Sequence, residues 1–514
     1  MNRPDLSFVI DVGTGSVRCA LVDDTGRIVA IRAREYEQIV PQYGWSEQRP
    51  ADWWDGVVHT ARELLEAEPG AAERLIGVVA TGQMHGTVLI DAEGEPVRDS
   101  VPLWNDKRTA ELVAAFEREH DIDAVMQCVA NPPTPAWQGF KLQWFARHEP
   151  EVLARSATLL MPKDYINYRL TGVRATDWTE ASASFLMDSA TRSWSHDVAA
   201  LLGVPADILP PIRSPLDVLG QVTKEAALAT GLPAGLPVAA GAADFPAALL
   251  GSGVHSPGAG SDVTGTSTIV TVHGEHPVLD SRVSNVATVD GGWGAFALLD
   301  SGGDAVRWAR RAFHDNELSY EQVTRRAAAA PAGSRGLFFL PYLTGERLGA
   351  RRNSRAGFFG LTAEHGLAHL HRAILEGVAF AAAGNVGLMR RGDTGLKQMT
   401  AAGGGAKSDL WLQIKASAYG CPIRVPESPE CSVIGSTAIL AAALGRHETP
   451  ASAAEAFVHF AHVVEPDPVW AERYERMRGV FDQLRDAGGP FYDMLDALDE
   501  TVLESDSGRG AGHA

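Results

Sequence analysis

The chain has 514 residues, of which 45% are hydrophobic and 21% charged, a composition typical of a folded protein with two large domains. Its 45 basic and 64 acidic side chains give a formal net charge of −19, which disfavours binding to nucleic acid and to anionic membrane surfaces. The four cysteines form no CxxC pair, and no apolar stretch has the length of a signal peptide or a membrane span. We therefore expect a cytoplasmic protein with reduced thiols.

The first elements in chain order form a β-hairpin followed by a third strand. Phe8–Asp11 and Val17–Val22 are apolar runs of strand length, and the turn Asp23-Asp24-Thr25-Gly26 leads into Arg27–Ile31. Another apolar strand, Leu75–Ala80, precedes helical stretches such as Thr109–Glu119. Strands that alternate with helices indicate an α/β architecture.

The opening motif returns near the middle of the chain. Asp11-Val12-Gly13-Thr14-Gly15-Ser16 and Asp262-Val263-Thr264-Gly265-Thr266-Ser267 each precede an apolar strand, at Val17–Val22 and Thr268–Val272. One short match between Gly, Thr and Ser residues can arise by chance, but its position favours an ancient duplication. We therefore expect two similar α/β halves, each of which offers a turn to a central cleft.

Loop-forming residues indicate where the two halves meet. Gly, Ser and Pro cluster at 251–260, so we place one domain at 1–250 and the other at 251–500. Residues 505–514 are rich in Gly and polar side chains, and we expect this tail to be disordered.

Asp11 is the first candidate for a phosphate or metal site. The chain has no GxxxxGK[ST] loop, and no GxGxxG opens a helix, so both common nucleotide-binding loops are disfavoured. The backbone N–H groups and hydroxyls of the turn after Asp11 can instead form an anion nest, and Arg18 could reach a phosphate oxygen. The alternative is that Asp11 is only a turn former.

Asp244 is the second candidate, because it follows a strand of small residues at 239–243. A carboxylate among apolar residues loses its hydration, and we expect it to be retained only if it is paired, bound to a metal or catalytic. An N-cap for a helix at Phe245–Leu250 is the structural alternative, and Pro246 early in that helix supports it. The two interpretations are compatible.

The third candidate is the glycine-rich turn at 403–405. It follows a strand at Gln398–Ala401 and precedes a helix at Asp409–Tyr419, which Gly420 and Pro422 end. Three glycines permit a flat or anionic ligand to approach the backbone at a helix N-terminus. A plain flexible loop is equally compatible with the pattern.

Together these features resemble the FGGY family of carbohydrate kinases. Ala356-Gly357-Phe358-Phe359-Gly360-Leu361 and the following 369–376 fit the C-terminal signature of that family. Within the family the chain is most similar to the xylulokinases, and the motifs that carry this likeness are Trp45-Ser46-Glu47-Gln48, Gly82-Gln83-Met84-His85-Gly86, Trp104-Asn105-Asp106-Lys107-Arg108 and Pro162-Lys163-Asp164-Tyr165. The resemblance implies two ribonuclease-H-like domains of the actin-like ATPase type, around a central cleft.

The resemblance also implies roles for individual residues. Asp244 would be the general base, and Asp11 and Asp244 would lie at a Mg²⁺ site. The sugar would contact Met84, His85, Trp104 and Asp244. ATP would be bound on one side by Asp11, Thr14, Gly15, Ser16 and Arg18, and from the other domain by Gly265 and Thr266 at the phosphates and by Gly404 and Gly405 at the adenosine.

The expected activity is ATP-dependent transfer of the γ-phosphoryl group to a terminal hydroxyl of a ketopentose, with D-xylulose as the first choice of substrate. The expected partners are therefore a sugar and ATP, and the family likeness implies a homodimer. Phe245 stands where xylulokinases usually have a polar residue, and Gln138 departs from the family's other signature, which has a small hydroxyl residue or Pro there. Kinases for another ketose, a deoxy sugar or a polyol remain alternatives, as does a non-catalytic actin-like sugar sensor.

Two of the sugar-side residues have open interpretations. His85 could be a second base or a passive hydrogen-bond donor to the sugar, and we favour the passive role because Asp244 already supplies a base. Trp104 could form a wall of the sugar pocket or belong to the core.

Overall fold

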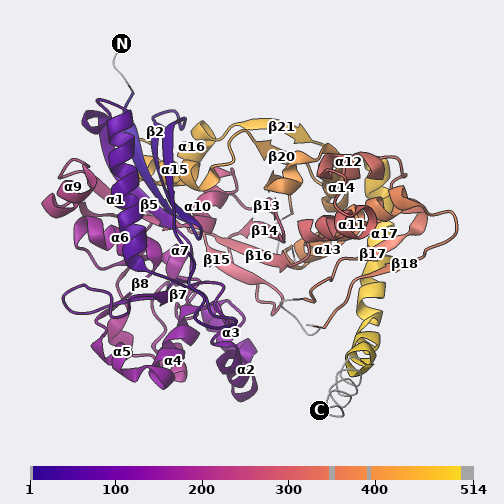
Figure 1. The fold of residues 1–514 in the computed structure, drawn as a ribbon, viewed down its shortest axis with the longest axis horizontal. Coiled ribbons are helices and arrows are strands. Elements are labelled where there is room, and N and C mark those ends of the chain that lie inside the picture. Colours follow the sequence, from indigo (N-terminus) through magenta and orange to yellow (C-terminus); the bar gives the residue numbers. More distant parts are fainter. Residues whose placement is uncertain (1–3, 347–352, 391–394, 499–514) are drawn as a thin grey trace, which may run out of the picture.

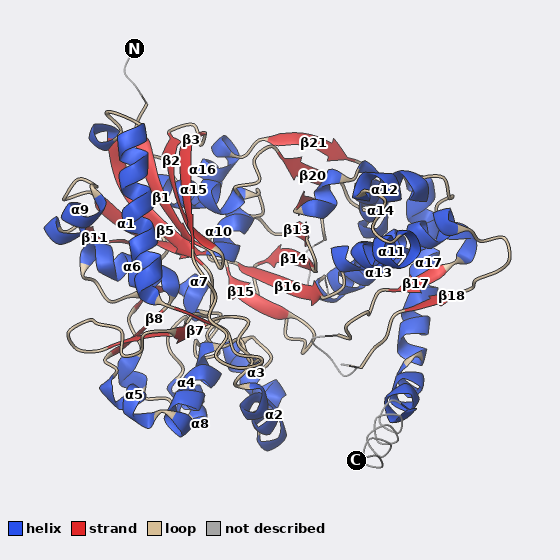
Figure 2. Cartoon of the chain, viewed as in Figure 1, coloured by secondary structure: helices blue, strands red, loops and turns tan. Residues whose placement is uncertain are grey.

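The structure, a computed structural model, describes residues 4–346, 353–390 and 395–498 (Figure 1). The tail at 505–514 lies outside these residues. Two mixed β-sheets with helices around them make up two α/β domains, as the sequence predicts (Figure 2). None of the helices in the described ranges is long and apolar enough to span a bilayer. All four cysteines are free.

The first sheet has six strands in the order β11-β12-β5-β1-β2-β3. β1 pairs antiparallel with β2 and parallel with β5, so the predicted hairpin is confirmed. The strands of this sheet are β1 (Leu6–Val12), β2 (Ser16–Asp23), β3 (Ile28–Glu35), β5 (Leu75–Gly82), β11 (Val218–Gln221) and β12 (Pro237–Ala243).

The second sheet repeats this arrangement in the order β15-β16-β14-β13-β19-β20-β21. Its hairpin β13–β14 is antiparallel, and β19 lies parallel beside β13, as β5 lies beside β1. The strands are β13 (Ala259–Thr264), β14 (Thr268–Gly274), β15 (Ser284–Ala287), β16 (Trp293–Leu299), β19 (Gln398–Ala402), β20 (Ile423–Pro426) and β21 (Phe460–Val464). The equivalent hairpins support the duplication that the repeated motif predicts.

Short strand pairs lie outside the two sheets. They are formed by β4 (Glu47–Gln48) with β7 (Val101–Pro102), β6 (Val88–Ile90) with β8 (Thr158–Leu160), β9 (Thr176–Asp177) with β10 (Ile212–Arg213), and β17 (Phe338–Leu340) with β18 (Gly357–Phe359).

α-Helices surround the two sheets. The first half carries α1 (Pro50–Ala67), α2 (Ala110–Glu119), α3 (Ile122–Val129), α4 (Gln138–His148), α5 (Pro150–Arg155), α6 (Pro162–Thr171), α7 (Trp178–Ala181), α8 (His196–Leu202), α9 (Lys224–Thr230) and α10 (Asp244–Gly251). The second half carries α11 (Gly303–His314), α12 (Tyr320–Ala327), α13 (Leu367–Met389), α14 (Asp409–Tyr419), α15 (Cys431–Ala443), α16 (Pro450–Phe457) and α17 (Pro468–Ala487).

Helix α15 belongs to the second half of the sequence but packs against the first sheet (Figure 1). Its side chains Val433, Ile439 and Leu440 are buried in one apolar cluster with Val9 and Val79 of the first sheet. The two domains therefore share a hydrophobic core rather than meeting only through a linker.

Helices α10 and α15 cross at two glycines. A Cβ on Gly251 would lie 1.9 Å from the carbonyl oxygen of Cys431, and a Cβ on Gly435 would lie 1.9 Å from that of Ala247. Only glycine permits this approach of the two backbones. The crossing brings the N-terminal ends of α10 and α15 to the turn end of the β1–β2 hairpin, where Asp11 lies.

Candidate active site

Asp11 lies opposite Arg18 in the antiparallel β1–β2 hairpin. Its carboxylate is buried and accepts hydrogen bonds from Arg18 Nη2 at 2.5 Å and from Ser432 Oγ at 2.9 Å. Arg18 Nη1 binds Glu430 at 2.5 Å, so the guanidinium lies between two carboxylates. Glu430 and Ser432 come from the start of α15 in the second domain, and no sequence motif pointed to them. Asp11 and Arg18, which the sequence assigns to one phosphate site, are thus in direct contact, and their bonds to Ser432 and Glu430 join the two domains.

Asp244 is the first residue of α10, and Ala243 holds the N-cap position. The alternative that Asp244 is the N-cap is therefore wrong. Burial, and secondarily the negative charge of Asp11, raises the pKa of Asp244 to about 7, while the backbone N–H of Phe245 and the charge of Arg18 work in the opposite direction. A carboxyl group with such a pKa can accept a proton at neutral pH.

Thr14 connects the hairpin turn to the predicted sugar side. Trp104 Nε1 donates to Thr14 Oγ1 at 3.1 Å, and Gln48 Nε2 donates to the Thr14 carbonyl oxygen at 2.6 Å. Trp104 is 41% exposed, which excludes the core interpretation and leaves its indole at the surface of the site. Gly15 is exposed and Ser16 half-buried in the same turn. Gln48 belongs to one of the motifs that carry the family likeness, but the sequence alone did not assign it this contact.

His85 has a left-handed backbone, with φ of 66°, in the turn after β5. Its Nδ1 lies 2.9 Å from the carbonyl oxygen of Ala183, and its ring packs edge-on against Trp137 at 5.0 Å between centroids. Burial, and secondarily the charge of Lys141, lowers the pKa of His85 to about 3. The ring is therefore neutral, Nδ1–H donates to the carbonyl, and Nε2 is left as an acceptor. This tautomer suits a sugar hydroxyl that donates, rather than the donor role expected for His85.

Met84 precedes His85 and is half-buried against an apolar cluster behind the same turn. The turn is fixed by α4. Buried Lys141 donates from Nζ to the carbonyl oxygens of His85 and Leu103, both at 2.7 Å. Gln138 Nε2 donates to the Gly86 carbonyl at 2.8 Å. The unusual Gln138 thus has a structural role, and Lys141 ties the His85 turn to the segment that carries Trp104.

The predicted nucleotide-binding turns lie together in the second domain. Gly265 and Thr266 are exposed, and their carbonyl oxygens accept from the N–H groups of Gly303 at 3.1 Å and Asp304 at 2.9 Å. The turn at 403–405 lies against Thr264: a Cβ on Gly403 would be 2.6 Å from the Thr264 carbonyl oxygen, and one on Gly405 2.7 Å from the Thr264 Cβ. Gly404 is exposed beside them. The structure therefore brings Gly265, Thr266 and Gly404 to one surface, and Gly405 is buried against Thr264 beside them.

This surface is not joined to the Asp11 region by hydrogen bonds within the described ranges. The residue after Asp244 contacts the second domain through an aromatic pair: the ring of Phe245 packs edge-on against Phe296 of β16 at 5.2 Å between centroids. The residue that departs from the xylulokinase pattern is thus part of the contact between the domains.

A Mg²⁺ site at Asp11 and Asp244 fits the donors that the structure presents. No group of three or more His, Cys, Asp or Glu side chains suited to a metal occurs in the part of the chain that is described. Asp11 and Asp244 are two carboxylates close enough for one to raise the pKa of the other. Mg²⁺ is usually held by one or two carboxylates together with substrate phosphates, so this pair suits a metal that arrives with a nucleotide.

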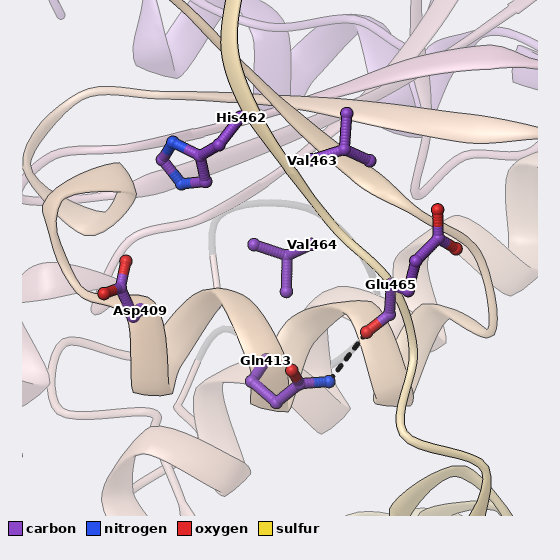
Figure 3. Close-up of a pocket in the computed structure, with 6 residues that line it drawn as sticks. All are labelled: Asp409, Gln413, His462, Val463, Val464 and Glu465. Carbon is purple, nitrogen blue, oxygen red and sulfur yellow. Dashed lines mark hydrogen bonds between the residues drawn. The ribbon is translucent and has the colours of Figure 1, made fainter.

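An open pocket of about 750 Å³ lies between α14 and β21, away from Asp11 and Asp244 (Figure 3). It is lined by Asp409, Gln413, His462, Val463, Val464 and Glu465. Gln413 Nε2 donates to the Glu465 carbonyl oxygen at 2.8 Å at its edge. None of the predicted site residues lines it, so cavity size alone does not locate the site.

Comparisons with known proteins agree with the geometry. Residues 6–251 match the N-terminal domain, and residues 261–444 the C-terminal domain, of the FGGY family of carbohydrate kinases. The chain is 30% identical over 477 residues to a xylulose kinase from Bacillus subtilis, which covers 92% of this chain and 94% of the relative. The crystal structure of a xylulose kinase from Rhodospirillum rubrum superimposes with a TM-score of 0.89 at 31% identity, covering 95% of this chain and all of that one. A gluconate kinase from Lactobacillus acidophilus reaches the same TM-score at 24% identity over 96% of this chain and 100% of its own, which shows only the shared fold.

Proposed function

Because the chain belongs to the FGGY family of carbohydrate kinases, and is therefore a sugar kinase, we propose that it phosphorylates D-xylulose on its terminal hydroxyl with ATP and Mg²⁺. The observation that carries the chemistry is the Asp244 carboxyl group, whose pKa is raised to about 7 beside Asp11. The choice of sugar is supported by the likeness to the xylulose kinases of Bacillus subtilis and Rhodospirillum rubrum. The product is D-xylulose 5-phosphate.

Asp244 is the general base in this proposal. It accepts the proton of the attacking hydroxyl as that oxygen approaches the γ-phosphorus, and neutral His85 accepts a hydrogen bond from another sugar hydroxyl through Nε2. The exposed face of Trp104 covers the sugar beside Thr14. Mg²⁺, when bound at Asp11 and Asp244, would neutralise charge on the phosphate oxygens.

The second domain supplies the nucleotide side. We assign the sugar and phosphate side to a domain at 1–250 and the nucleotide side to a domain at 251–500. Gly265 and Thr266 face the phosphates, and Gly404 and Gly405 allow the adenosine to lie against the backbone. Closure of the two domains would bring this surface to Asp11 and Arg18, and would exclude water from the reaction.

An ADP-release assay over a panel of ketoses, aldoses and polyols tests this proposal. We expect Mg²⁺-dependent turnover, with the highest kcat/KM for D-xylulose. A higher kcat/KM for a deoxy sugar or polyol would support the kinase activity but show that D-xylulose is not the preferred substrate. Tight ATP binding with no turnover of any sugar would instead support a non-catalytic sensor.

A further inference from the structure

The strand that carries Asp244 to the site is interrupted by a bulge. β12 pairs with β5 through Val238 and Ala239, and the register shifts before Ala242. Gly241, at the shift, has φ of 70°, and a Cβ there would lie 2.0 Å from the carbonyl oxygen of Ala80. A bulge leaves backbone groups outside the sheet ladder, where they need other partners.

Two buried side chains bind the carbonyl group that this bulge releases. Asn167 Nδ2 donates to the Ala240 oxygen at 2.8 Å, and Lys163 Nζ lies 3.2 Å from the same atom. Both residues are on α6 and are fully buried. Lys163 and Asn167 therefore hold the strand at Ala240, the residue before Gly241.

A third side chain fixes the strand directly before Asp244. The N–H of Ala243 donates to Thr179 Oγ1 at 2.9 Å, and that hydroxyl donates in turn to Asp177 Oδ1 at 2.5 Å. The Thr179 hydroxyl therefore both accepts and donates a hydrogen bond. A side chain of the same shape without an oxygen, such as Val, can do neither.

Asp177 connects the side chains that bind Ala240 with the one that binds Ala243. It lies 2.9 Å from Lys163 Nζ, and Lys163 also binds Asp164 at 2.5 Å. All of these groups are at most 1% exposed, so the ion pairs are shielded from water and their loss leaves charges without partners. We call Lys163, Asp164, Asn167, Asp177 and Thr179 the anchor cluster.

We propose that the anchor cluster positions Asp244 for proton transfer, with Thr179 and Asn167 as the two attachments that set its place. This inference rests on the proposed role of Asp244 as the base. Among the described residues, the hydrogen bonds from the cluster to β12 reach the backbone before Asp244, so these are positioning residues rather than catalytic ones. A displacement of about 1 Å at a reacting group can lower a rate by about 100-fold, which gives such anchors a measurable effect.

The experiment compares matched variants of the full chain. Thr179→Val keeps the shape of the side chain but removes both hydrogen bonds, whereas Thr179→Ser keeps the hydroxyl. Asn167→Leu removes the donor to Ala240 and should fold, because Asn167 Oδ1 already has no partner among the described residues. Glu180→Gln is the control, since Glu180 is buried next to the cluster with neither carboxyl oxygen hydrogen-bonded to a described residue.

We expect Thr179→Val and Asn167→Leu to lower kcat at least about tenfold. The KM for ATP should change less than about twofold, so that the loss appears in kcat alone. Thr179→Ser and Glu180→Gln should stay within about threefold of the wild-type kcat. A wild-type kcat in Thr179→Val and Asn167→Leu, or an equal loss in Glu180→Gln, would overturn the inference. Asp244→Asn, measured alongside, separates the two proposals, since near-normal activity in that variant refutes the base itself.

Discussion

The protonation of Asp244 determines how the activity depends on pH. With a pKa of about 7, the carboxyl group is increasingly protonated, and unable to act as a base, as the pH falls below that value. We expect kcat/KM to fall by about tenfold for each pH unit below about 6.5. The measurement is a profile of kcat/KM between pH 5 and 9.

His85 provides the control for that profile. Its pKa is lowered to about 3, so it does not titrate in this range. His85→Asn should therefore weaken sugar binding and leave the acidic limb in place. If the acidic limb of the kcat/KM profile disappeared in His85→Asn, the titrating group would be His85, and the role of Asp244 would be contradicted.

Asp244 also makes the folded protein less stable at neutral pH than an uncharged residue would. A carboxyl group whose folded pKa is raised adds stability at pH values below its unfolded pKa, and that stability is lost as the pH rises through about 7. Asp244→Asn should therefore increase the free energy of unfolding by on the order of 1–3 kcal/mol at pH 8, and by less at pH 5. Denaturant unfolding at both pH values checks this; an equal gain at pH 5 and pH 8 would contradict it.

Asp11 and Asp262 show how far sequence motifs predict the site. The two occupy equivalent strands in repeated motifs, but Asp262 is bound by Lys415 Nζ at 2.7 Å and by the hydroxyl of Tyr419 at 2.5 Å within its own domain. Asp11 is bound instead by Arg18 and by Ser432 of the other domain. The motif predicts where each carboxylate lies, but the partners come from distant helices and follow only from tertiary packing.

At the scale of elements, the crossing of α10 and α15 controls both the core and the place of Asp244. A Cβ on Gly435 would lie 1.9 Å from the Ala247 carbonyl oxygen and would push the helices apart. Gly435→Ala should lower the free energy of unfolding by at least about 2 kcal/mol and should reduce kcat, because α10 begins at Asp244.

Gly479 in α17 is the matched control, because a Cβ there meets no atom within 4 Å. Gly479→Ala should raise stability by about 0.5–1 kcal/mol through helix propensity alone. Urea unfolding of the two variants gives the comparison. Equal effects in both would show that the crossing does not need glycine at 435.

The sequence predicts the bounds of a helix well where residues at its two ends cap it. α14 starts and stops at the predicted residues, since Ser408 caps it through Trp411 N–H and Gly420 ends it with a left-handed backbone. The bulge at Gly241 was not predicted, because its cause is the close backbone of β5 and the anchor cluster rather than any local pattern. The same is true of Ala243, which replaces Asp244 as the N-cap.

At the scale of the molecule, the shared core makes the first domain dependent on the second. The face of the first sheet that includes Val9 and Val79 is covered by α15 and α16, which lie beyond residue 430. A fragment of residues 1–253 should therefore expose this apolar face, bind a hydrophobic dye and lack a cooperative thermal transition. A cooperative transition like that of the full chain would contradict the shared core.

The central claim is that Asp244 accepts the proton during transfer of the phosphoryl group to a sugar. Single-turnover transfer from γ-³²P-labelled ATP to D-xylulose measures this step directly, in the wild-type chain and in Asp244→Asn, with the Kd for ATP measured on the same samples. We expect transfer in the wild type and a rate at least about 100-fold lower in the variant, with the Kd for ATP within about threefold. Transfer at a wild-type rate in Asp244→Asn would contradict the claim.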